Sequence, residues 1–126
     1  MARLLLDTHV LLWSLAAPSK LSTRAGEALE DAYNDVFVSA VTAWEISVKR
    51  AKGRLTAPDN LSEVLEKRGF THLPLNFHHA EQAGNLPSHH RDPFDRFLIA
   101  QAQIEGLVLV TRDARIPLHG IRTMAA

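Results

Sequence analysis

Two apolar segments with strand character, one near each end of the chain, are each followed within three residues by an aspartate. Arg3–Leu6 precedes Asp7, and Leu107–Val110 precedes Thr111-Arg112-Asp113. Short apolar runs of this kind are typical of strands buried on both faces, which occur in parallel sheets covered by helices. The two segments therefore predict two strands in the interior of a parallel α/β sheet.

Helical patterns alternate with weaker strand patterns between these two segments. Six helices are expected. The first covers 8–17, the second begins after an N-cap at Ser22, and the third begins after an N-cap at Thr42, with Glu45 completing a capping box. The others run from Asp59 or Asn60 to Gly69, over 78–84, and from Asp92-Pro93 to Gly106. Further strands are expected over 36–38, 72–75 and 121–124, with Pro74 placing one at an edge. At 126 residues the chain suits one domain, 1–126, with a three-layer α/β/α sandwich around a central, mainly parallel sheet.

The composition excludes several classes of function. The chain has no cysteine, which rules out disulfides, thiolate metal sites and cysteine nucleophiles. No apolar stretch approaches the roughly 18 residues of a membrane span, and no signal peptide is recognisable. A cytoplasmic location is expected from these features.

Charge is balanced overall but unevenly distributed. With 14 basic and 14 acidic residues, the formal net charge is zero and does not by itself indicate nucleic-acid binding. Basic residues cluster over 49–54. Two of the four candidate carboxylates discussed below also have arginines close to them in sequence, namely Arg91, Arg96, Arg112 and Arg115. Such residues are suited to holding a substrate that carries phosphate.

Four carboxylates are expected at one edge of the sheet. Asp7 and Asp113 follow predicted strands, while Glu45 and Asp95 lie in the first turns of helices that face the same edge. Carboxylates held close together repel one another unless a cation neutralises them, and oxygen-only ligation suits Mg²⁺ or Mn²⁺. Such an ion polarises a phosphate and lowers the pKa of bound water, so the pattern predicts phosphodiester hydrolysis.

Each of these acids also has a structural explanation. Asp7 is suited to capping the following helix, and Glu45 to a capping box or to an ion pair with Lys49. Asp95 would be stabilised by the helix dipole, and Asp113 by a turn. Their common position at one predicted sheet edge favours the functional interpretation.

A set of ordered segments carries a resemblance to a known family. The segments are Leu5-Leu6-Asp7-Thr8-His9, Trp44-Glu45-Ile46, His89-His90-Arg91-Asp92-Pro93-Phe94-Asp95-Arg96 with Ile99-Ala100-Gln101-Ala102, and Leu109-Val110-Thr111-Arg112-Asp113. In this order and spacing, across nearly the whole chain, they resemble the PIN-domain ribonucleases, and more narrowly the VapC-type toxins of toxin–antitoxin modules.

The resemblance implies a Mg²⁺-dependent ribonuclease, with Mn²⁺ as a possible substitute. It assigns catalytic roles to Asp7, Glu45, Asp95 and Asp113, and among them makes Asp7 and Asp95 metal ligands. Asp95 is preferred to Asp92 because Ala102 follows it by seven residues, as the family pattern requires. Candidate substrate contacts are Thr8, Thr111, Arg96 and Arg112.

The resemblance also implies partners. They are a structured cellular RNA as substrate, a cognate antitoxin whose C-terminal segment enters the acidic groove, and a second copy of the chain in a homodimer. An arginine or lysine of the antitoxin would mimic or displace the metal among the carboxylates. Trp13 and Trp44 are expected mostly in core or dimer packing.

Other functions fit the sequence less well. A zinc site would use the pairs His78-His79 and His89-His90, but adjacent histidines point in different directions and none are four residues apart. A phospho-accepting receiver domain needs adjacent acids after its first strand, where this chain has Asp7 alone. Glycoside hydrolysis needs one pair of carboxylates rather than four converging acids. The main alternative is a non-catalytic RNA-binding PIN-like module.

Overall fold

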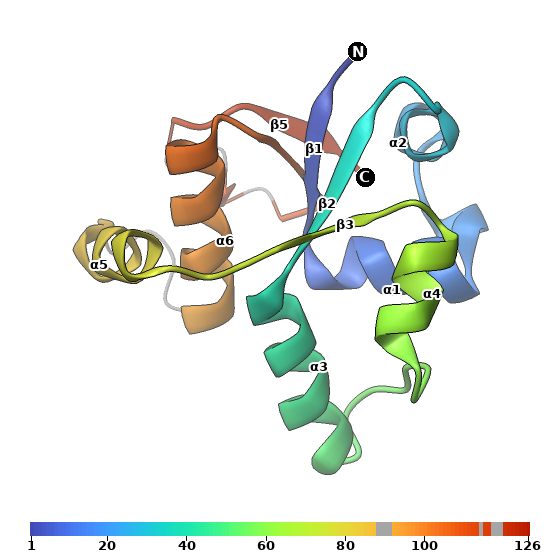
Figure 1. The fold of residues 1–126 in the computed structure, drawn as a ribbon, viewed down its shortest axis with the longest axis horizontal. Coiled ribbons are helices and arrows are strands. Elements are labelled where there is room, and N and C mark those ends of the chain that lie inside the picture. Colours follow the sequence, from blue (N-terminus) through green and yellow to red (C-terminus); the bar gives the residue numbers. More distant parts are fainter. Residues whose placement is uncertain (88–91, 114, 117–119) are drawn as a thin grey trace.

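The computed structural model describes residues 1–87, 92–113, 115–116 and 120–126, which form one five-stranded sheet with helices on both sides. The strands are β1 (Arg3–Leu6), β2 (Asp35–Ser39), β3 (Thr71–Leu73), β4 (Val108–Thr111) and β5 (Thr123–Ala125), in the spatial order β3-β2-β1-β4-β5 (Figure 1). Every neighbouring pair in this sheet is parallel. The predicted parallel α/β sheet is confirmed, with the two apolar segments as the adjacent central strands β1 and β4.

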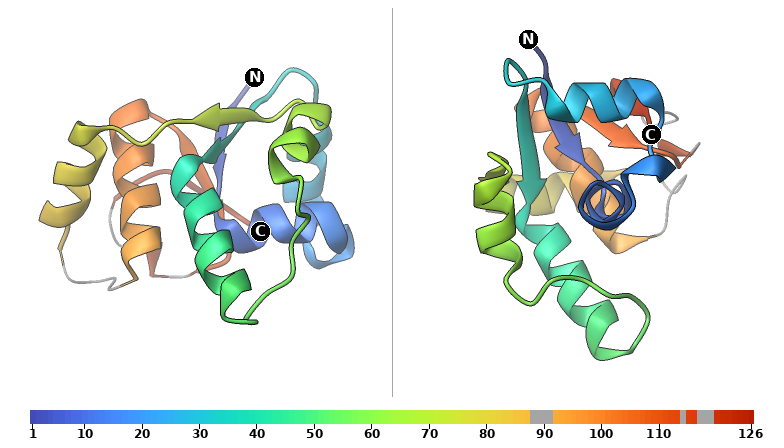
Figure 2. Two further views of the ribbon diagram at one scale, coloured as in Figure 1. Left: turned by 60° about the horizontal axis from the view of Figure 1, so that its bottom comes forward. Right: turned by 90° about the vertical axis from the view of Figure 1, so that its right-hand side faces the viewer.

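Helices cover both faces of the sheet. They are α1 (Thr8–Ala16), α2 (Thr23–Glu30), α3 (Ala40–Ala51), α4 (Leu61–Lys67), α5 (Phe77–Asn85) and α6 (Pro93–Glu105), with a 3₁₀ turn over Pro18–Lys20. Helices α1, α2 and α4 lie on one side of the sheet and α5 and α6 on the other (Figure 2). This arrangement is the expected three-layer sandwich.

Alternation along β1 explains why two layers of helices are needed. Leu4 and Leu6 pack into the core beneath α1, α2 and α4, whereas Leu5 packs into the core beneath α6, and all three are fully buried. Successive side chains of a strand point to opposite faces of the sheet, so a strand that is apolar throughout must be covered twice. In strand β4, Leu109 and Val110 divide between the two cores in the same way.

The start of α3 differs from the expectation. The helix begins at Ala40, and its N-cap is Ser39, whose hydroxyl accepts a hydrogen bond from the Val41 N–H at 3.0 Å. The expected N-cap, Thr42, lies inside the helix and is buried, so the capping box with Glu45 does not form. The prediction was wrong because β2 continues into α3 without a loop, and Glu45 consequently lies in the second turn.

Other boundaries shift by a few residues. Strand β3 ends at Leu73 because Pro74, which has no N–H, cannot continue the ladder, and β3 does lie at an edge of the sheet. Helix α5 is longer than the predicted 78–84, and Asn60 occupies the N-cap position of α4 without a side-chain capping bond. Trp44 is 53% exposed, so it is not a core residue.

The helices have lengths typical of a globular domain. No helix in the described ranges is both long enough and apolar enough to cross a membrane. Helix α6 is the longest element that carries a candidate site residue, and it ends at Gly106, whose φ of 67° lies in the left-handed region that favours glycine.

Candidate active site

The chain reverses its direction of travel across the sheet at β1. From β1 it proceeds to β2 and β3 on one side, and then returns to β4 on the other side of β1. In an open parallel sheet, such a switch point leaves a crevice beyond the carboxyl ends of the two flanking strands. Asp7 follows β1 at this crevice, and Thr111 is the last residue of β4.

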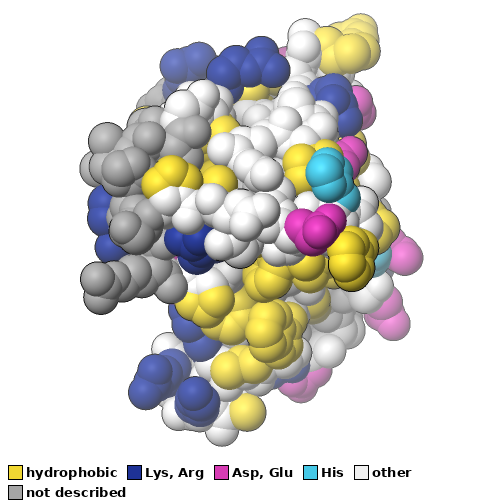
Figure 3. Space-filling model, turned by 90° about the vertical axis from the view of Figure 1, so that its left-hand side faces the viewer, with side chains coloured by type: hydrophobic (Ala, Val, Ile, Leu, Met, Phe, Trp, Pro, Cys, Tyr) yellow, Lys and Arg dark blue, Asp and Glu magenta, His cyan; other side chains and the backbone are white. Residues whose placement is uncertain are grey.

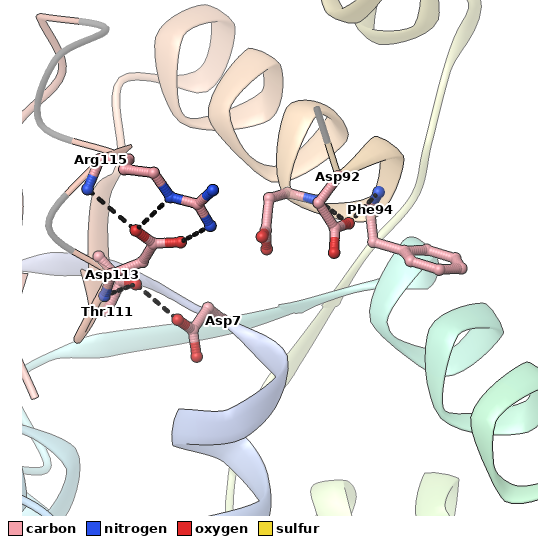
Figure 4. A network of polar contacts seen from close by, with 7 residues as sticks. Asp7, Asp92, Phe94, Thr111, Asp113 and Arg115 are labelled. Atoms are coloured by element: carbon pink, nitrogen blue, oxygen red, sulfur yellow. Dashed lines mark hydrogen bonds and ion pairs between the residues drawn. The ribbon is translucent and has the colours of Figure 1, made fainter. Parts of the chain in front are cut away.

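Asp7 is held in place from three directions. Its N–H donates to the Val110 carbonyl at 3.1 Å, its Oδ1 accepts from the Val10 N–H at 2.9 Å, and its Oδ2 accepts from the Thr111 hydroxyl at 2.6 Å. The residue therefore caps α1, as the structural explanation held, and still projects into the crevice (Figure 4). Burial raises the pKa of Asp7, although the bonds from Thr111 and Val10 and the charge of His9 act in the opposite direction.

Glu45 reaches the crevice from α3 and is only 4% exposed. Its Oε1 accepts from the Thr8 hydroxyl at 2.6 Å, and its Oε2 pairs with the Lys49 ammonium at 2.5 Å, one helical turn further on. Burial by itself would lower the pKa of Lys49, but the hydrogen bond and charge of Glu45, with Asp92 and Asp95, raise it overall. The Glu45–Lys49 pair that the spacing allowed is thus present, and it lies inside the crevice.

The remaining acids come from α6 and from the segment after β4. Asp92 is the N-cap of α6 and accepts from the N–H groups of Phe94 and Asp95 at 2.9 and 3.2 Å. Asp113 binds Arg115 through both its carboxylate oxygens, at 3.2 and 3.0 Å, and its own N–H donates to the Thr111 hydroxyl. Asp7 and Asp113 lie across from the start of α6 in Figure 4.

These elements enclose a pocket of about 120 Å³, called here the acidic pocket. It is lined by Asp7, Thr8, His9, Trp13, Glu45, Lys49, Asp92, Asp95, Arg112 and Asp113. All four predicted acids therefore reach one pocket at the predicted edge of the sheet.

The donor chemistry of the acidic pocket fits a hard divalent cation. Its acids offer carboxylate oxygens, which Mg²⁺ and Mn²⁺ prefer. As the side chains are arranged, however, no three His, Asp or Glu groups in the described ranges are close enough together to hold an ion. Protein donors bind Asp7, Glu45 and Asp113 instead, so a cation would compete with them for the same oxygens.

The candidate substrate contacts have different surroundings. Thr8 and Thr111 are buried and donate to Glu45 and Asp7, so they orient the acids. Arg96 donates to the carbonyls of Ala83, Leu86 and Pro87 at the end of α5 and is not part of the pocket lining. Arg112 does line the pocket, and it donates to the main-chain oxygens of Lys20 and Ala126.

Four pocket residues, His9, Trp13, Lys49 and Asp92, were not among the predicted site residues. Lys49 was considered only as an ion-pair partner of Glu45, and its spacing of four residues was the signal for its position in the pocket. Asp92 lines the pocket beside Asp95, and its signal was the Asp-Pro helix start. Trp13 was expected in packing, and the sequence has no pattern that distinguishes a core tryptophan from one at the edge of a pocket. Of the histidine pairs, His79 is buried and bonds Glu105 at 2.9 Å, while His89-His90 lies outside the described residues.

The chain is therefore a parallel α/β sandwich with a carboxylate-lined pocket at the switch point of its sheet. The family model of the PIN domain matches residues 4–120, and the chain belongs to the PIN-domain family. It is 33% identical over 127 residues to Ribonuclease VapC22 of Mycobacterium tuberculosis (strain ATCC 25618 / H37Rv), covering 94% of this chain and 93% of that protein.

Solved structures with the same fold include components of toxin–antitoxin complexes. DNA-bound VapBC from Salmonella typhimurium matches with a TM-score of 0.67 and 21% identity, covering 99% of this chain and 98% of the other. VapBC2 from Rickettsia felis, bound to a DNA fragment from its promoter, matches with a TM-score of 0.69 and 12% identity over 98% of each chain. At these identities the likeness establishes the fold, in agreement with the PIN-domain assignment.

Proposed function

We propose that the chain is a Mg²⁺-dependent ribonuclease that hydrolyses RNA phosphodiester bonds in the acidic pocket and acts as the toxin of a toxin–antitoxin pair. The observation that carries the proposal is the convergence of Asp7, Glu45, Asp95 and Asp113 on one pocket at the switch point of the sheet. The 33% identity to a VapC ribonuclease supports the same activity. Mn²⁺ would satisfy the same oxygen donors.

The proposal gives each acidic residue a role. Asp7 and Asp95 would hold the metal ion, which when bound supplies a polarised phosphate oxygen and an acidified water. Thr111 orients the Asp7 carboxylate, and Thr8 orients that of Glu45, each through a bond of 2.6 Å. Glu45 and Asp113 complete the negative charge of the pocket and help to position the ion or the attacking water.

The ion pairs within the pocket favour one alternative, a non-catalytic RNA-binding module. Lys49 and Arg115 already neutralise Glu45 and Asp113 in part, so two of the pocket's acids are paired with cations of the chain itself. A module of this kind would bind RNA equally well after removal of divalent ions. The ribonuclease differs because its reaction requires the metal.

Metal removal is the experiment that separates these two functions. Purified protein is incubated with total cellular RNA in Mg²⁺, and in parallel after treatment with EDTA. Cleavage in Mg²⁺ that stops with EDTA and returns with excess Mg²⁺ is the expected result. RNA that is bound but uncut in both conditions would instead support the binding module.

The proposed partners are RNA, a cognate antitoxin and a second copy of the chain, all met in the cytoplasm. An antitoxin partner is supported by the structural relatives, which include DNA-bound VapBC and a toxin–antitoxin complex from Klebsiella pneumoniae. Figure 3 shows hydrophobic side chains on the face of the molecule on which α5 lies. At the start of α5, Phe77 is 80% exposed, and Leu75 just before it is 37% exposed. Exposed apolar side chains of this size support a homodimer contact there.

Replacing Thr111 with valine is expected to reduce kcat by roughly 10-fold while leaving the fold intact. Valine has nearly the same shape, but it removes the hydroxyl that donates to Asp7 and accepts from the Asp113 N–H. Steady-state cleavage of a labelled oligoribonucleotide measures the loss, and Thr56→Val, outside the pocket lining, is the matched control. Equal kcat values for the two variants would show that Thr111 does not orient the acids.

A further inference from the structure

Trp13, Arg112 and His9 form a cluster of flat side chains at the wall of the acidic pocket, and the proposed hydrolysis does not use them. All three line that pocket. Trp13 lies on α1, with part of its side chain packed against the core and part accessible. Arg112 and His9 are both exposed. The cluster is called here the aromatic wall.

The orientation of Arg112 is fixed by a ring contact and by hydrogen bonds to main-chain oxygens. The centre of its guanidinium group lies 4.2 Å from the centroid of the Trp13 ring, close enough for a cation–π contact. The same group donates to the main-chain oxygens of Lys20 and Ala126, the latter at 3.1 Å. The guanidinium is therefore held against the ring at the pocket wall.

His9 also lies beside the tryptophan ring. Its ring centroid lies 6.0 Å from that of Trp13, with an angle of 32° between the planes. The two residues are four positions apart on α1, which places them on one face of the helix. His9 follows Asp7 by two positions, so the wall begins close in sequence to the acids.

The position of Arg112 also connects two hollows in the surface. Beyond the acidic pocket, a second hollow of about 540 Å³ is lined by Lys20, Ser22 and Thr123, among others, and it shares Arg112 and Asp113 with that pocket. An extended ligand that enters the acidic pocket can thus continue across the aromatic wall into the second hollow.

A nucleobase has the chemistry that this wall would recognise. Bases of single-stranded RNA stack on aromatic rings and on guanidinium planes. A base is also uncharged, so it can lie beside five carboxylates without the repulsion that a second phosphate would meet. We propose that the aromatic wall binds an unpaired nucleobase next to the phosphate that is cut. This proposal rests on the proposed ribonuclease function.

Cleavage of abasic oligoribonucleotides tests the site. A series of substrates, each lacking one base, is compared in Mg²⁺ with the parent protein, Arg112→Lys and Trp13→Leu. For the parent, one abasic position is expected to lower kcat/KM by about 5- to 150-fold, the range that stacking of one base is worth. Arg112→Lys and Trp13→Leu are expected to have a similarly reduced kcat/KM with the intact substrate. Removal of the same base from the substrate should not lower their kcat/KM further.

Matched substitutions separate stacking from charge and from folding. Arg112→Lys keeps the positive charge and removes the planar group, while Trp13→Phe keeps an aromatic ring and should restore part of the base dependence. Trp44→Leu is the control, because Trp44 is a half-exposed tryptophan that does not line the acidic pocket. Variants that remain as sensitive as the parent to the missing base would overturn the proposal.

Fluorescence gives a second measurement that does not depend on cleavage. The chain has two tryptophans, so Trp44→Leu leaves Trp13 as the sole one. This protein is titrated in EDTA with an intact oligoribonucleotide and with its abasic counterpart at the position found above, or with a fully abasic one if no protein cleaves. Quenching by the intact oligonucleotide alone supports the site even if the ribonuclease proposal fails, and an absence of quenching overturns it.

Discussion

Replacing Asp7 with asparagine is expected to lower kcat/KM for Mg²⁺-dependent RNA cleavage on the order of 10³-fold. The substitution removes a negative charge that the metal ion requires and keeps the shape of the side chain. Asparagine can still accept the Val10 N–H through its amide oxygen, so the cap of α1 is preserved. The measurement is cleavage of a labelled oligoribonucleotide under conditions where the parent follows Michaelis–Menten kinetics.

Two further variants make this result interpretable. Asp95→Asn should cause a loss of similar size, because Asp95 would share the metal and lines the same pocket. Asp59→Asn removes the same charge from a fully exposed side chain on the connection between α3 and α4, and it should cut RNA like the parent. A folded Asp7→Asn protein with the activity of Asp59→Asn would exclude the acidic pocket as the site of hydrolysis.

Mg²⁺ is expected to stabilise the folded parent protein substantially, by about 2.7 kcal/mol when its free concentration is 100 times its Kd. A bound cation would remove the repulsion between Asp7 and Glu45 and would compensate the burial of Asp7. The measurement is Tm by thermal unfolding in increasing Mg²⁺, compared with the same series for Asp7→Asn and Asp59→Asn. Stabilisation of Asp59→Asn but not of Asp7→Asn is expected, and equal shifts in all three proteins would indicate metal binding elsewhere.

The raised pKa of Asp7 gives this stabilisation a defined pH dependence. Because burial raises the pKa above the ordinary 3.8, the folded metal-free protein binds a proton more tightly than the unfolded chain does. Stability contributed by protonated Asp7 is therefore present below the ordinary pKa and is lost as the pH rises to the raised pKa. Mg²⁺ competes with that proton, so its effect on Tm should be larger at neutral than at acidic pH. A shift that does not change with pH would contradict this linkage.

Much of the candidate site could be predicted because its residues follow from local patterns. Asp7 and Asp113 are placed by the strands that precede them, since the carboxyl ends of parallel strands meet at one edge. Asp95 is placed by the Asp-Pro start of α6. Glu45 was assigned to the correct edge, but it lies in the second turn of its helix and not in the first. The reason is that α3 begins three residues earlier than the Thr42 signal indicated.

The partners of these acids that are distant in the sequence could not be predicted in the same way. Thr111 is separated from Asp7 by 104 residues, and its hydroxyl bonds Oδ2 only because β4 pairs with β1. Arg96 was expected near the substrate but extends to the end of α5, because α5 and α6 pack side by side. Such contacts depend on strand order and helix packing, which local periodicity does not encode.

The sequence by itself determined the class of fold, the interior strands and the edge at which the acids gather, because burial on two faces and strand ends leave a local pattern. The tertiary structure decided which groups those acids contact. It placed Lys49 inside the acidic pocket rather than on the surface, and it brought Arg112 against Trp13, 99 positions earlier in the chain. The physical reason is that a hydrogen bond or ring contact is made between atoms a few ångströms apart, and only the assembled sheet brings distant segments that close.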